Sequence, residues 1–495
     1  MQCYYGEVLE VIKNKVKKVA GGSRWLPTVA SLLTGLAFLN GHLSWLVLFG
    51  LVPFILYARR AHNWTARQIL FDCCVAAFFF SLIAGGWTLQ TEPSNWIGLQ
   101  GGTSVAVKII TWLIIALCSG IIFGLIVGVF VSKLKWEPVK LWFMLPFVWA
   151  LAELARSYGL AFLFIGPGSS LSPNWNFGAF GLAVASTPLA YIGRFIGLYG
   201  LSAVAIAVNI TVYLFIVKRY KVVVIVAAGI LVTNFAAWRL YLPDTNRTIK
   251  VAAVYIHNPA GSLDPWGRVA TPTKNTAVLV LPEYSSFFKN PGYEKFAATH
   301  FGAKTIVITT EAGAGSPHTN DLVYYTYQTG FISRQSKTFL APYGEYMPYS
   351  ASWMLKTFRQ QVALTNFQLH SQVQRGATPE HVVRASGLTV GGLACSGVLN
   401  LNEYRRLADQ GADILTNSAS LSLLETASLY RVQEMYQNRF HAIANAKPFV
   451  QSARSGEAYI ISSDGKILSL ANKQSRLITS SLKLQPKRTL YSLLP

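Results

Sequence analysis

Charged residues are scarce in this sequence of 495 residues, of which only 13% are Asp, Glu, Lys or Arg. Soluble globular proteins carry roughly twice that fraction. Acids are the rarer sign, at 21 against 43 basic residues, and hydrophobic residues make up 52% of the chain. So much apolar surface excludes intrinsic disorder, and five cysteines in 495 residues exclude a disulfide-stapled scaffold. The composition therefore indicates a membrane protein rather than an ordinary soluble enzyme.

Long apolar runs fill the first half of the chain. Seven of them have about 16 to 25 residues, the length needed to cross a bilayer core. They lie at approximately 26–40, 43–58, 69–87, 107–131, 139–156, 195–217 and 222–238. From residue 243 onward no run is long enough to span, and 15 of the 21 acids occur there. We therefore expect a membrane domain over 1–242 with about seven transmembrane helices, and a water-soluble domain over 243–495.

The basic residues favour one orientation in the membrane. Lys and Arg gather before the first apolar run and after the second, fourth and sixth, whereas the stretch 157–193 contains none. By the positive-inside rule the N-terminus is cytoplasmic, and an odd number of spans places the second domain outside the cytoplasm. We expect a multi-pass protein of the cytoplasmic (inner) membrane. Basic runs placed between apolar segments also favour the bilayer over nucleic acid as the reason for the net charge of +22.

Residues 243–495 alternate short β-rich runs with polar and helical stretches. We expect strands at 250–256, 277–281, 305–310, 322–326, 338–341, 388–394, 413–415, 449–453 and 458–462, and a helix over 424–446. This order predicts an α/β sandwich of two sheets covered by helices on both sides, an αββα arrangement.

Several polar residues of this domain stand next to apolar runs. Cys395 ends one run and is the only cysteine of the domain, so it is either a nucleophile or a small buried hydrophobe. Glu283 ends another run, where it could act as the general base for the thiol. Lys337 precedes an expected strand and could favour the thiolate or stabilise an oxyanion. Trp266 is a candidate substrate contact.

Taken in order, Leu281-Pro-Glu283, Lys337 with Pro342-Tyr-Gly-Glu345, and the run ending at Cys395 resemble the Glu-Lys-Cys triad of the nitrilase (carbon-nitrogen hydrolase) superfamily. With a multispan region before it, the chain is similar to the apolipoprotein N-acyltransferase family. The resemblance implies a nitrilase-like catalytic domain outside the cytoplasm. It also implies that Glu345 supports the site by orienting Lys337 or Glu283.

The resemblance further implies the reaction and its partners. Cys395 would attack a phospholipid acyl donor to form a thioester, and the α-amine of a diacylglyceryl-modified apolipoprotein would then take the acyl chain. Glu283 would handle the protons and Lys337 would hold the oxyanion. No metal and no organic cofactor is implied, and neither is a nucleic-acid partner.

Three features depart from that family. Ser396 and Gly397 stand where the family has an aromatic residue and a glutamate, and no apolar run follows the soluble domain as a last span. The stretch from Ile256 to Glu283, which contains Trp266, is also shorter than the resemblance leads us to expect. Two other functions therefore stay open, a membrane-tethered amidase or nitrilase with water as acceptor, and a divergent inactive homologue. In the membrane half, Glu153 and Arg156 lie three residues apart on one expected helix and could pair with each other.

Overall fold

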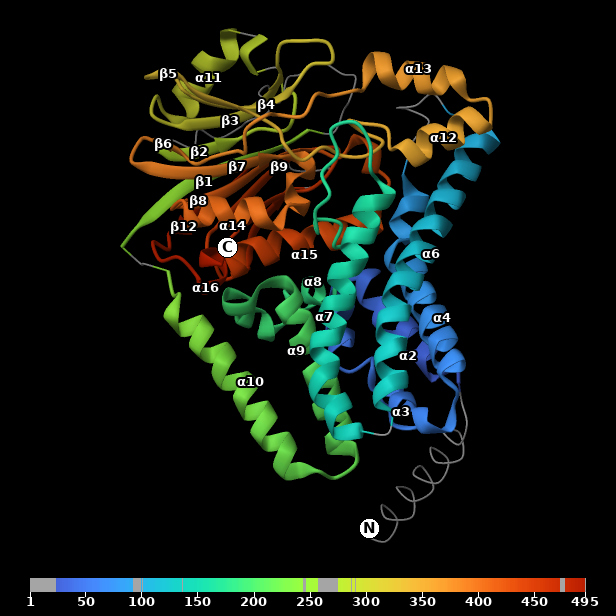
Figure 1. Ribbon diagram of the computed structural model, residues 1–495. Coiled ribbons are helices and arrows are strands. Elements are labelled where there is room, and N and C mark those ends of the chain that lie inside the picture. The colour runs from blue at the N-terminus through green and yellow to red at the C-terminus, as the bar shows by residue number, and fades with distance from the viewer. Residues whose placement is uncertain are drawn as a thin grey trace, which may run out of the picture.

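The computed structural model describes residues 24–91, 99, 101–135, 137–243, 246–256, 275–285, 287–289, 291–471 and 477–494. A helical bundle from the first half of the chain lies against a sheet-containing domain from the second half (Figure 1). The helices of the bundle are α2 (Leu26–Gly35), α3 (Val52–Arg59), α4 (Ala66–Ala84), α6 (Gly101–Leu134), α7 (Pro138–Leu163), α8 (Phe180–Val184), α9 (Gly193–Ile216) and α10 (Tyr220–Leu240). Short 3-10 helices are η1 (Leu36–Phe38), η2 (Gly41–Leu48), η3 (Ala61–Asn63), η4 (Gly86–Gln90) and η5 (Pro188–Ile192).

Five helical segments of the described chain are long and apolar enough to cross a membrane: Gly41–Arg59, Ala66–Gln90, Gly101–Leu134, Pro188–Ile216 and Tyr220–Leu240. They coincide with five of the seven expected spans. The first expected span forms the apolar helix Leu26–Phe38, which has fewer than 18 residues. The fifth forms α7, which is long enough at 26 residues but carries Glu153 and Arg156. A total of seven crossings therefore stays a prediction.

Two sheets form the second part of the chain. Their strands are β1 (Thr248–Ile256), β2 (Thr276–Val280), β3 (Ile306–Ala312), β4 (Asn320–Thr326), β5 (Gly330–Ser336), β6 (Val383–Ala385), β7 (Leu388–Ala394), β8 (Ile414–Ser420), β9 (Phe449–Arg454), β10 (Ala458–Ile461), β11 (Ile467–Ala471) and β12 (Leu477–Lys483). The strand order is β5-β4-β3-β2-β1-β9-β8-β7-β6, with β12 beside β1 and β10 beside β9. The end of β1 pairs with β9, so the two sheets are joined along one edge.

Strand β1 shows why the two sheets pack face to face. Its alternate residues Val251 and Ala253 belong to the core between the sheets, together with residues of β7, β8 and β9. The residues between them, Ala252 and Val254, pack on the opposite face against α11 (Pro291–Phe301). Because successive side chains of a strand point to opposite faces, a strand buried on both sides must be apolar throughout.

Helices cover both outer faces of the sandwich. On the second sheet, α14 (Leu401–Asp409) and α15 (Ser428–Ala444) contribute Tyr404, Leu407 and Ala442 to a core with the strands. Figure 1 shows α11 on the far side of the sheets from α14 and α15. This confirms the expected αββα arrangement. The remaining helices are α12 (Tyr349–Thr357), α13 (Gln361–His370) and α16 (Leu490–Leu493).

The structure corrects some of the expected elements. The strand expected at 338–341 is wrong, because this segment is a loop that follows β5. Strand β5 was not expected from the sequence, since it is a sheet-edge strand whose side chains are mostly exposed or half-buried. Helix α15 begins at Ser428, four residues later than expected, after a short 3-10 turn.

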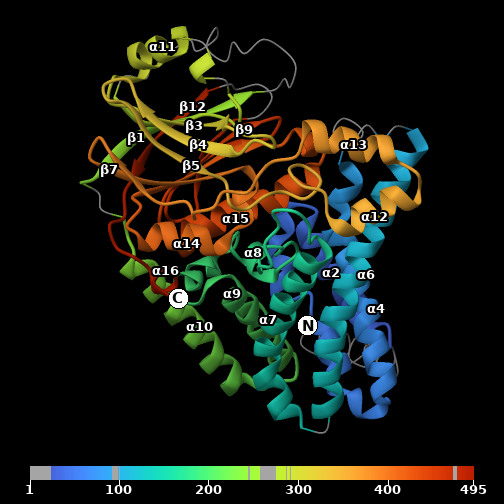
Figure 2. The ribbon, with the colours of Figure 1, turned by 45° about the horizontal axis from the view of Figure 1, so that its top comes forward.

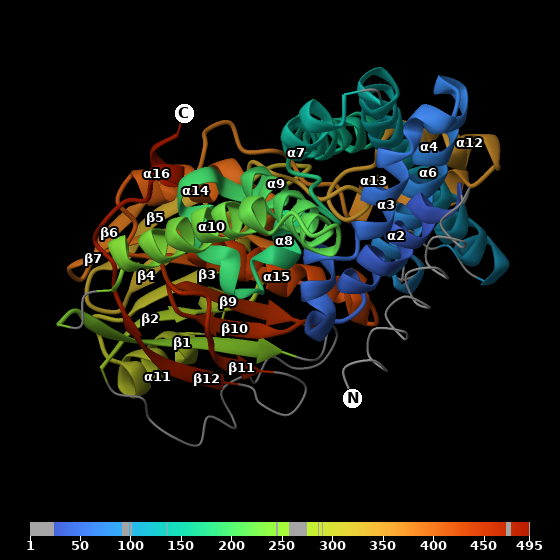
Figure 3. The same ribbon diagram turned by 90° about the horizontal axis from the view of Figure 1, so that it is seen from below.

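Helix α15 joins the sandwich to the bundle (Figures 2 and 3). Gln433 donates to the Ala84 carbonyl at 2.7 Å, and the Tyr436 hydroxyl donates to the Ala37 carbonyl at 2.7 Å. From the bundle side, the buried Arg194 guanidinium donates to the carbonyls of Ile443 and Ser463, at 3.1 and 2.9 Å. Because these donors fix backbone groups of both parts, the sandwich is held in one position on the bundle.

Candidate active site

The candidate catalytic residues meet where strands of both sheets end. Glu283 follows β2, and its backbone N–H donates to the Ala419 carbonyl in β8 of the other sheet at 3.2 Å. Cys395 directly follows β7, which runs parallel to β8. Lys337 directly follows β5, and its N–H donates to the Asn320 carbonyl at the start of β4. The expected triad is therefore brought to one place by five different strands.

Lys337 lies between two carboxylates. Its Nζ is 2.8 Å from Glu345 Oε1 and 3.7 Å from Glu283 Oε1. Lys337 and Glu283 are buried, with exposed fractions of 2% and 5%. The second oxygen of Glu345 accepts the Ala341 N–H at 2.7 Å. Glu345 thus contacts both the Lys337 ammonium group and the backbone next to it, and its supporting role in the site stays a prediction.

Asn320 is a member of this cluster that the sequence did not single out. Its Nδ2 donates to Glu283 Oε1 at 2.5 Å and to Glu345 Oε1 at 3.3 Å. The amide therefore holds the two carboxylates on either side of Lys337. A search for titratable groups overlooks it because an amide does not titrate.

Cys395 adopts an unusual backbone conformation. Its φ is +44°, in the left-handed region that costs a residue other than glycine free energy. Its Sγ donates to the Ser420 carbonyl at 3.2 Å, and the Glu283 carboxylate lies close enough to interact electrostatically with the thiol. A strained turn between a strand and a helical segment is a common way to expose a nucleophile.

Burial sets the protonation of the site. Loss of solvent, with the nearby Glu283 carboxylate, raises the pKa of Cys395, so its side chain rests as a thiol. Burial also raises the pKa of Glu283, against the opposing effect of Lys337, which makes this carboxylate a stronger base. Burial lowers the pKa of Lys337, but Glu345 and Glu283 outweigh it and raise the pKa overall. Lys337 therefore stays a cation.

A cavity of 520 Å³ opens beside the thiol and reaches into the bundle. Glu283, Glu345 and Cys395 line one end. The remainder is largely apolar, with Trp87, Ile115, Leu160, Phe164, Trp175 and Phe177 from the bundle and Leu421 and Leu424 from the sandwich. Lys108 and Arg156 also line it. A long apolar group could therefore lie against the membrane helices with its polar end at Cys395.

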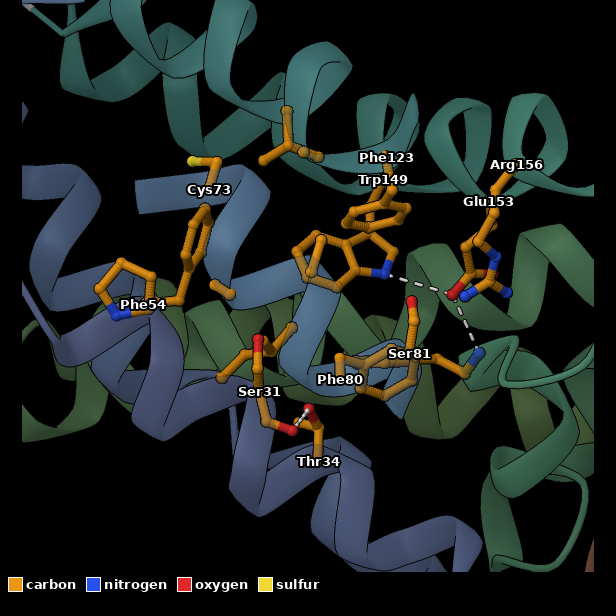
Figure 4. A pocket seen from close by; sticks show the side chains of 17 residues that line it. Ser31, Thr34, Phe54, Cys73, Phe80, Ser81, Phe123, Trp149, Glu153 and Arg156 are labelled. Atoms are coloured by element: carbon orange, nitrogen blue, oxygen red, sulfur yellow. Dashed lines mark hydrogen bonds between the residues drawn. The ribbon is translucent and has the colours of Figure 1, made fainter. Parts of the chain in front are cut away.

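Among the described residues no direct salt bridge joins Glu153 to Arg156, although the two side chains lie close enough to interact electrostatically. Glu153 instead accepts hydrogen bonds from Trp149 Nε1, the Phe180 N–H and the Ser202 hydroxyl, at 3.3, 2.9 and 2.5 Å. Figure 4 shows Trp149 and Glu153 at a small void of 30 Å³ inside the bundle. Glu153 thus ties α7 to α8 and α9.

The two residues after the nucleophile are closely packed. The Ser396 hydroxyl donates to the Phe339 carbonyl at 2.8 Å. A Cβ atom added to Gly397 would lie 2.6 Å from the Cβ of Leu393. The glutamate that the family carries here would therefore not fit without movement of the backbone. Trp266 lies outside the described residues.

Two families match the sequence. Residues 30–211 match the apolipoprotein N-acyltransferase N-terminal domain, and residues 241–489 match carbon-nitrogen hydrolase. An apolipoprotein N-acyltransferase of Allorhizobium ampelinum is 26% identical over 328 residues, which are 60% of this chain and 60% of that protein. The chain thus spans less than two thirds of the length of this curated relative.

Among solved structures, a carbon-nitrogen hydrolase from Helicobacter pylori G27 has 15% identity and a TM-score of 0.34, over 48% of this chain and 89% of that chain. Saccharomyces cerevisiae Nit3, a member of branch 10 of the nitrilase superfamily, has 14% identity and a TM-score of 0.33, over 48% of this chain and 90% of that chain. Because the second family match covers half of the sequence and contains the whole cluster, the chain belongs to the carbon-nitrogen hydrolase family, as a member that carries the apolipoprotein N-acyltransferase N-terminal domain.

Proposed function

We propose that this protein moves an acyl chain from a membrane phospholipid to the α-amine of the diacylglyceryl-modified cysteine at the N-terminus of apolipoproteins. The observation that carries the proposal is the position of the Cys395 thiol. It lies beside a buried base and at the polar end of an apolar cavity whose wall is formed by membrane helices. A hydrolase of small water-soluble amides has no need of such a wall.

In the first half-reaction Cys395 takes the acyl group. Glu283 accepts the thiol proton as Sγ attacks the ester carbonyl of the phospholipid. The carbonyl oxygen becomes an oxyanion, which the Lys337 ammonium stabilises. The ester C–O bond then breaks, and Glu283 returns the proton to the departing oxygen of the lysophospholipid. The enzyme is left with a thioester on Cys395.

In the second half-reaction the apolipoprotein amine takes the acyl group. The amine attacks the thioester carbonyl, Glu283 accepts a proton from the nitrogen, and Lys337 again faces the oxyanion. The C–S bond breaks, and the proton returns to the sulfur of Cys395. The product is an amide, so donor and acceptor react in turn at one thiol.

The membrane position of the site lowers the cost of handling these substrates. Moving an acyl chain from lipid into water costs about 0.8 kcal/mol for each methylene group. A cavity lined by Ile115, Leu160 and Phe164 accepts the chain without that step. Both substrates are anchored in lipid, which suits a site on top of a bundle.

The orientation follows from the basic loops. The turn between α6 and α7, with Lys133 and Lys135, and the turn between α9 and α10, with Lys218 and Arg219, lie at the end of the bundle away from the sheets (Figure 1). By the positive-inside rule these turns are cytoplasmic. The catalytic domain is then extracytoplasmic, in a multi-pass protein of the inner membrane.

The test is intact-mass spectrometry of the purified full-length protein after incubation with phospholipid. We expect the mass of one acyl chain on Cys395, no such mass in Cys395→Ala, and loss of the acyl mass when an S-diacylglyceryl-cysteine peptide is added. Hydrolysis of small amides without acylation by lipid would favour a membrane-tethered amidase or nitrilase. A folded protein that does neither would be an inactive homologue.

A further inference from the structure

A chain of buried polar side chains lies behind the nucleophile, on the side away from the cavity. Asn417, in β8, donates from Nδ2 to the Cys395 carbonyl at 3.2 Å and to Gln451 Oε1 at 3.0 Å. Gln451, in β9, donates from Nε2 to Glu434 Oε1 in α15 at 2.9 Å and to the Glu457 carbonyl at 3.1 Å. Asn417 and Gln451 are fully buried, and Glu434 is 1% exposed.

The hydrogen bonds of this chain have one direction. Because Gln451 donates to two acceptors, Glu434 and the Glu457 carbonyl, its own amide oxygen must face the other way. That oxygen accepts from Asn417 and, at 3.3 Å, from Asn438. If Gln451 were flipped, its amide nitrogen would face the nitrogens of both asparagines. The Glu434 carboxyl, as the acceptor at the end of this series of hydrogen bonds, therefore sets the orientation of Gln451. Gln451 in turn sets the orientation in which Asn417 donates to the Cys395 carbonyl.

The residue at the start of the chain is the one whose backbone is strained. Cys395 has a φ of +44°, and such a conformation persists only where its surroundings hold it. The bond from Asn417 holds the Cys395 carbonyl, while the thiol on the same residue is directed toward Ser420 and Glu283. If the thiol moves away from Glu283, the carboxylate can no longer accept the thiol proton during attack, and the rate of attack falls.

We propose that Glu434, Gln451 and Asn417 form a positioning chain that holds Cys395 in the conformation from which it attacks. These residues are positioning residues, since none of the three lines the cavity. This proposal rests on the function proposed above in one respect, which is the reaction that the thiol performs. The positioning itself concerns the thiol and Glu283, and can be measured without a lipid.

The structure also provides a matched control. Asn445, at the end of α15, is fully buried like Asn417. Its Nδ2 donates only to the backbone, at the His441 carbonyl, and the Oδ1 atoms of both asparagines lack a partner among the described residues. Replacing either asparagine by leucine removes the same chemical group from the core of the same domain. Only one of the two changes breaks the chain to Cys395.

The first measurement is the rate of alkylation of Cys395 by iodoacetamide in the full-length protein, followed by peptide mass spectrometry so that the other cysteines do not interfere. We expect Asn417→Leu and Gln451→Leu to lower this rate by about tenfold or more, because small displacements of reacting groups have large effects on rate. Asn445→Leu should stay within about twofold of the wild type, by the same argument.

The second measurement separates positioning from general loss of structure. In acyl transfer from phospholipid, Asn417→Leu should lower kcat while the KM for the lipid stays unchanged, since the cavity wall is intact. Glu434→Leu should slow alkylation, and Glu434→Gln, which keeps an acceptor oxygen at the end of the chain, should restore it.

Equal losses in Asn417→Leu and Asn445→Leu would overturn the proposal, as would wild-type rates in all variants. If Asn417→Leu does not fold, the Glu434 pair decides, and equal rates for its leucine and glutamine variants would refute the chain. A wild type that alkylates with the expected pattern but never accepts an acyl group from phospholipid would refute the proposed function and leave the positioning chain standing.

Discussion

The substitution Glu434→Gln should make the folded protein more stable at neutral pH. Glu434 is 1% exposed, and its Oε2 has no hydrogen-bond partner among the described residues. Burial raises the pKa of this carboxyl from 4.5 to about 8. Gln451 opposes the rise by its hydrogen bond, Glu457 adds to it, and Arg431 on the same helix opposes it. The carboxyl is therefore mainly protonated in the folded protein at pH 7.

The direction of the pH dependence follows from linkage. Below pH 4.5 the carboxyl is protonated in both states, so it costs nothing. Between 4.5 and about 8 the unfolded chain releases the proton and the folded protein keeps it, so the free energy of unfolding falls as pH rises. At roughly 1.4 kcal/mol for each pH unit, the loss is about 3 kcal/mol at pH 7 and about 4 kcal/mol at pH 8, where the folded carboxyl is itself half ionised. Glutamine has no proton to release and avoids this loss.

The assay is thermal unfolding of wild type and Glu434→Gln in the same detergent, read by tryptophan fluorescence at several pH values. The two midpoints should agree near pH 4.5 and separate as pH rises, with the variant higher by roughly 6 to 12 °C at pH 7. A difference that does not change with pH would refute the reasoning, because a packing effect has no such dependence. A variant that melts lower at pH 8 would refute it as well.

Three further predictions concern the proposed catalytic residues and the topology. Glu283→Gln should lower the rate of thioester formation by about 100- to 10,000-fold, measured by the acyl mass in single-turnover samples, since a general base contributes that much. Lys337→Met should lower the same rate by about 100- to 1,000-fold through loss of oxyanion stabilisation, with KM for phospholipid compared as a control. Reporter fusions after Lys221 and after Leu242 should lie on opposite sides of the membrane, and reporters on the same side would contradict the proposed orientation.

The sequence predicted those parts of the fold in which one physical signal dominates. Apart from Thr389, the run 388–394 is apolar and buried because both faces of β7 are covered, and the expected bounds agree with the structure. Edge strands gave no such signal. Strand β5 has exposed or half-buried side chains at most positions, so its residues resemble a polar loop, whereas the apolar residues 338–341 that follow it have the sequence pattern of a strand.

The candidate site was predicted as far as chemistry is visible in residue type. A thiol and a base each stand out at the end of an apolar run and a cation at the start of another, and the fold brings Cys395, Glu283 and Lys337 together. Asn320 and Asn417 were not predicted, because an amide at a strand residue has the same sequence signature whether it is solvated or holds a carboxylate. Their roles follow from contacts between distant parts of the sequence. Asn320 contacts Glu283, which lies 37 positions away, and Asn417 contacts Cys395, which lies 22 positions away.

The packing at Gly397 connects the departure from the family to the question of what the thiol does. A carboxylate after the nucleophile could add charge near the acceptor amine, but a side chain at Gly397 would collide with Leu393 in β7. The backbone of this protein therefore leaves no space for a side chain at this position. Proton transfer is assigned to Glu283 and oxyanion stabilisation to Lys337, so attack by the thiol does not need a carboxylate at position 397. In the proposed mechanism, we therefore expect the missing carboxylate to affect the attack of the amine on the thioester, and not formation of the thioester.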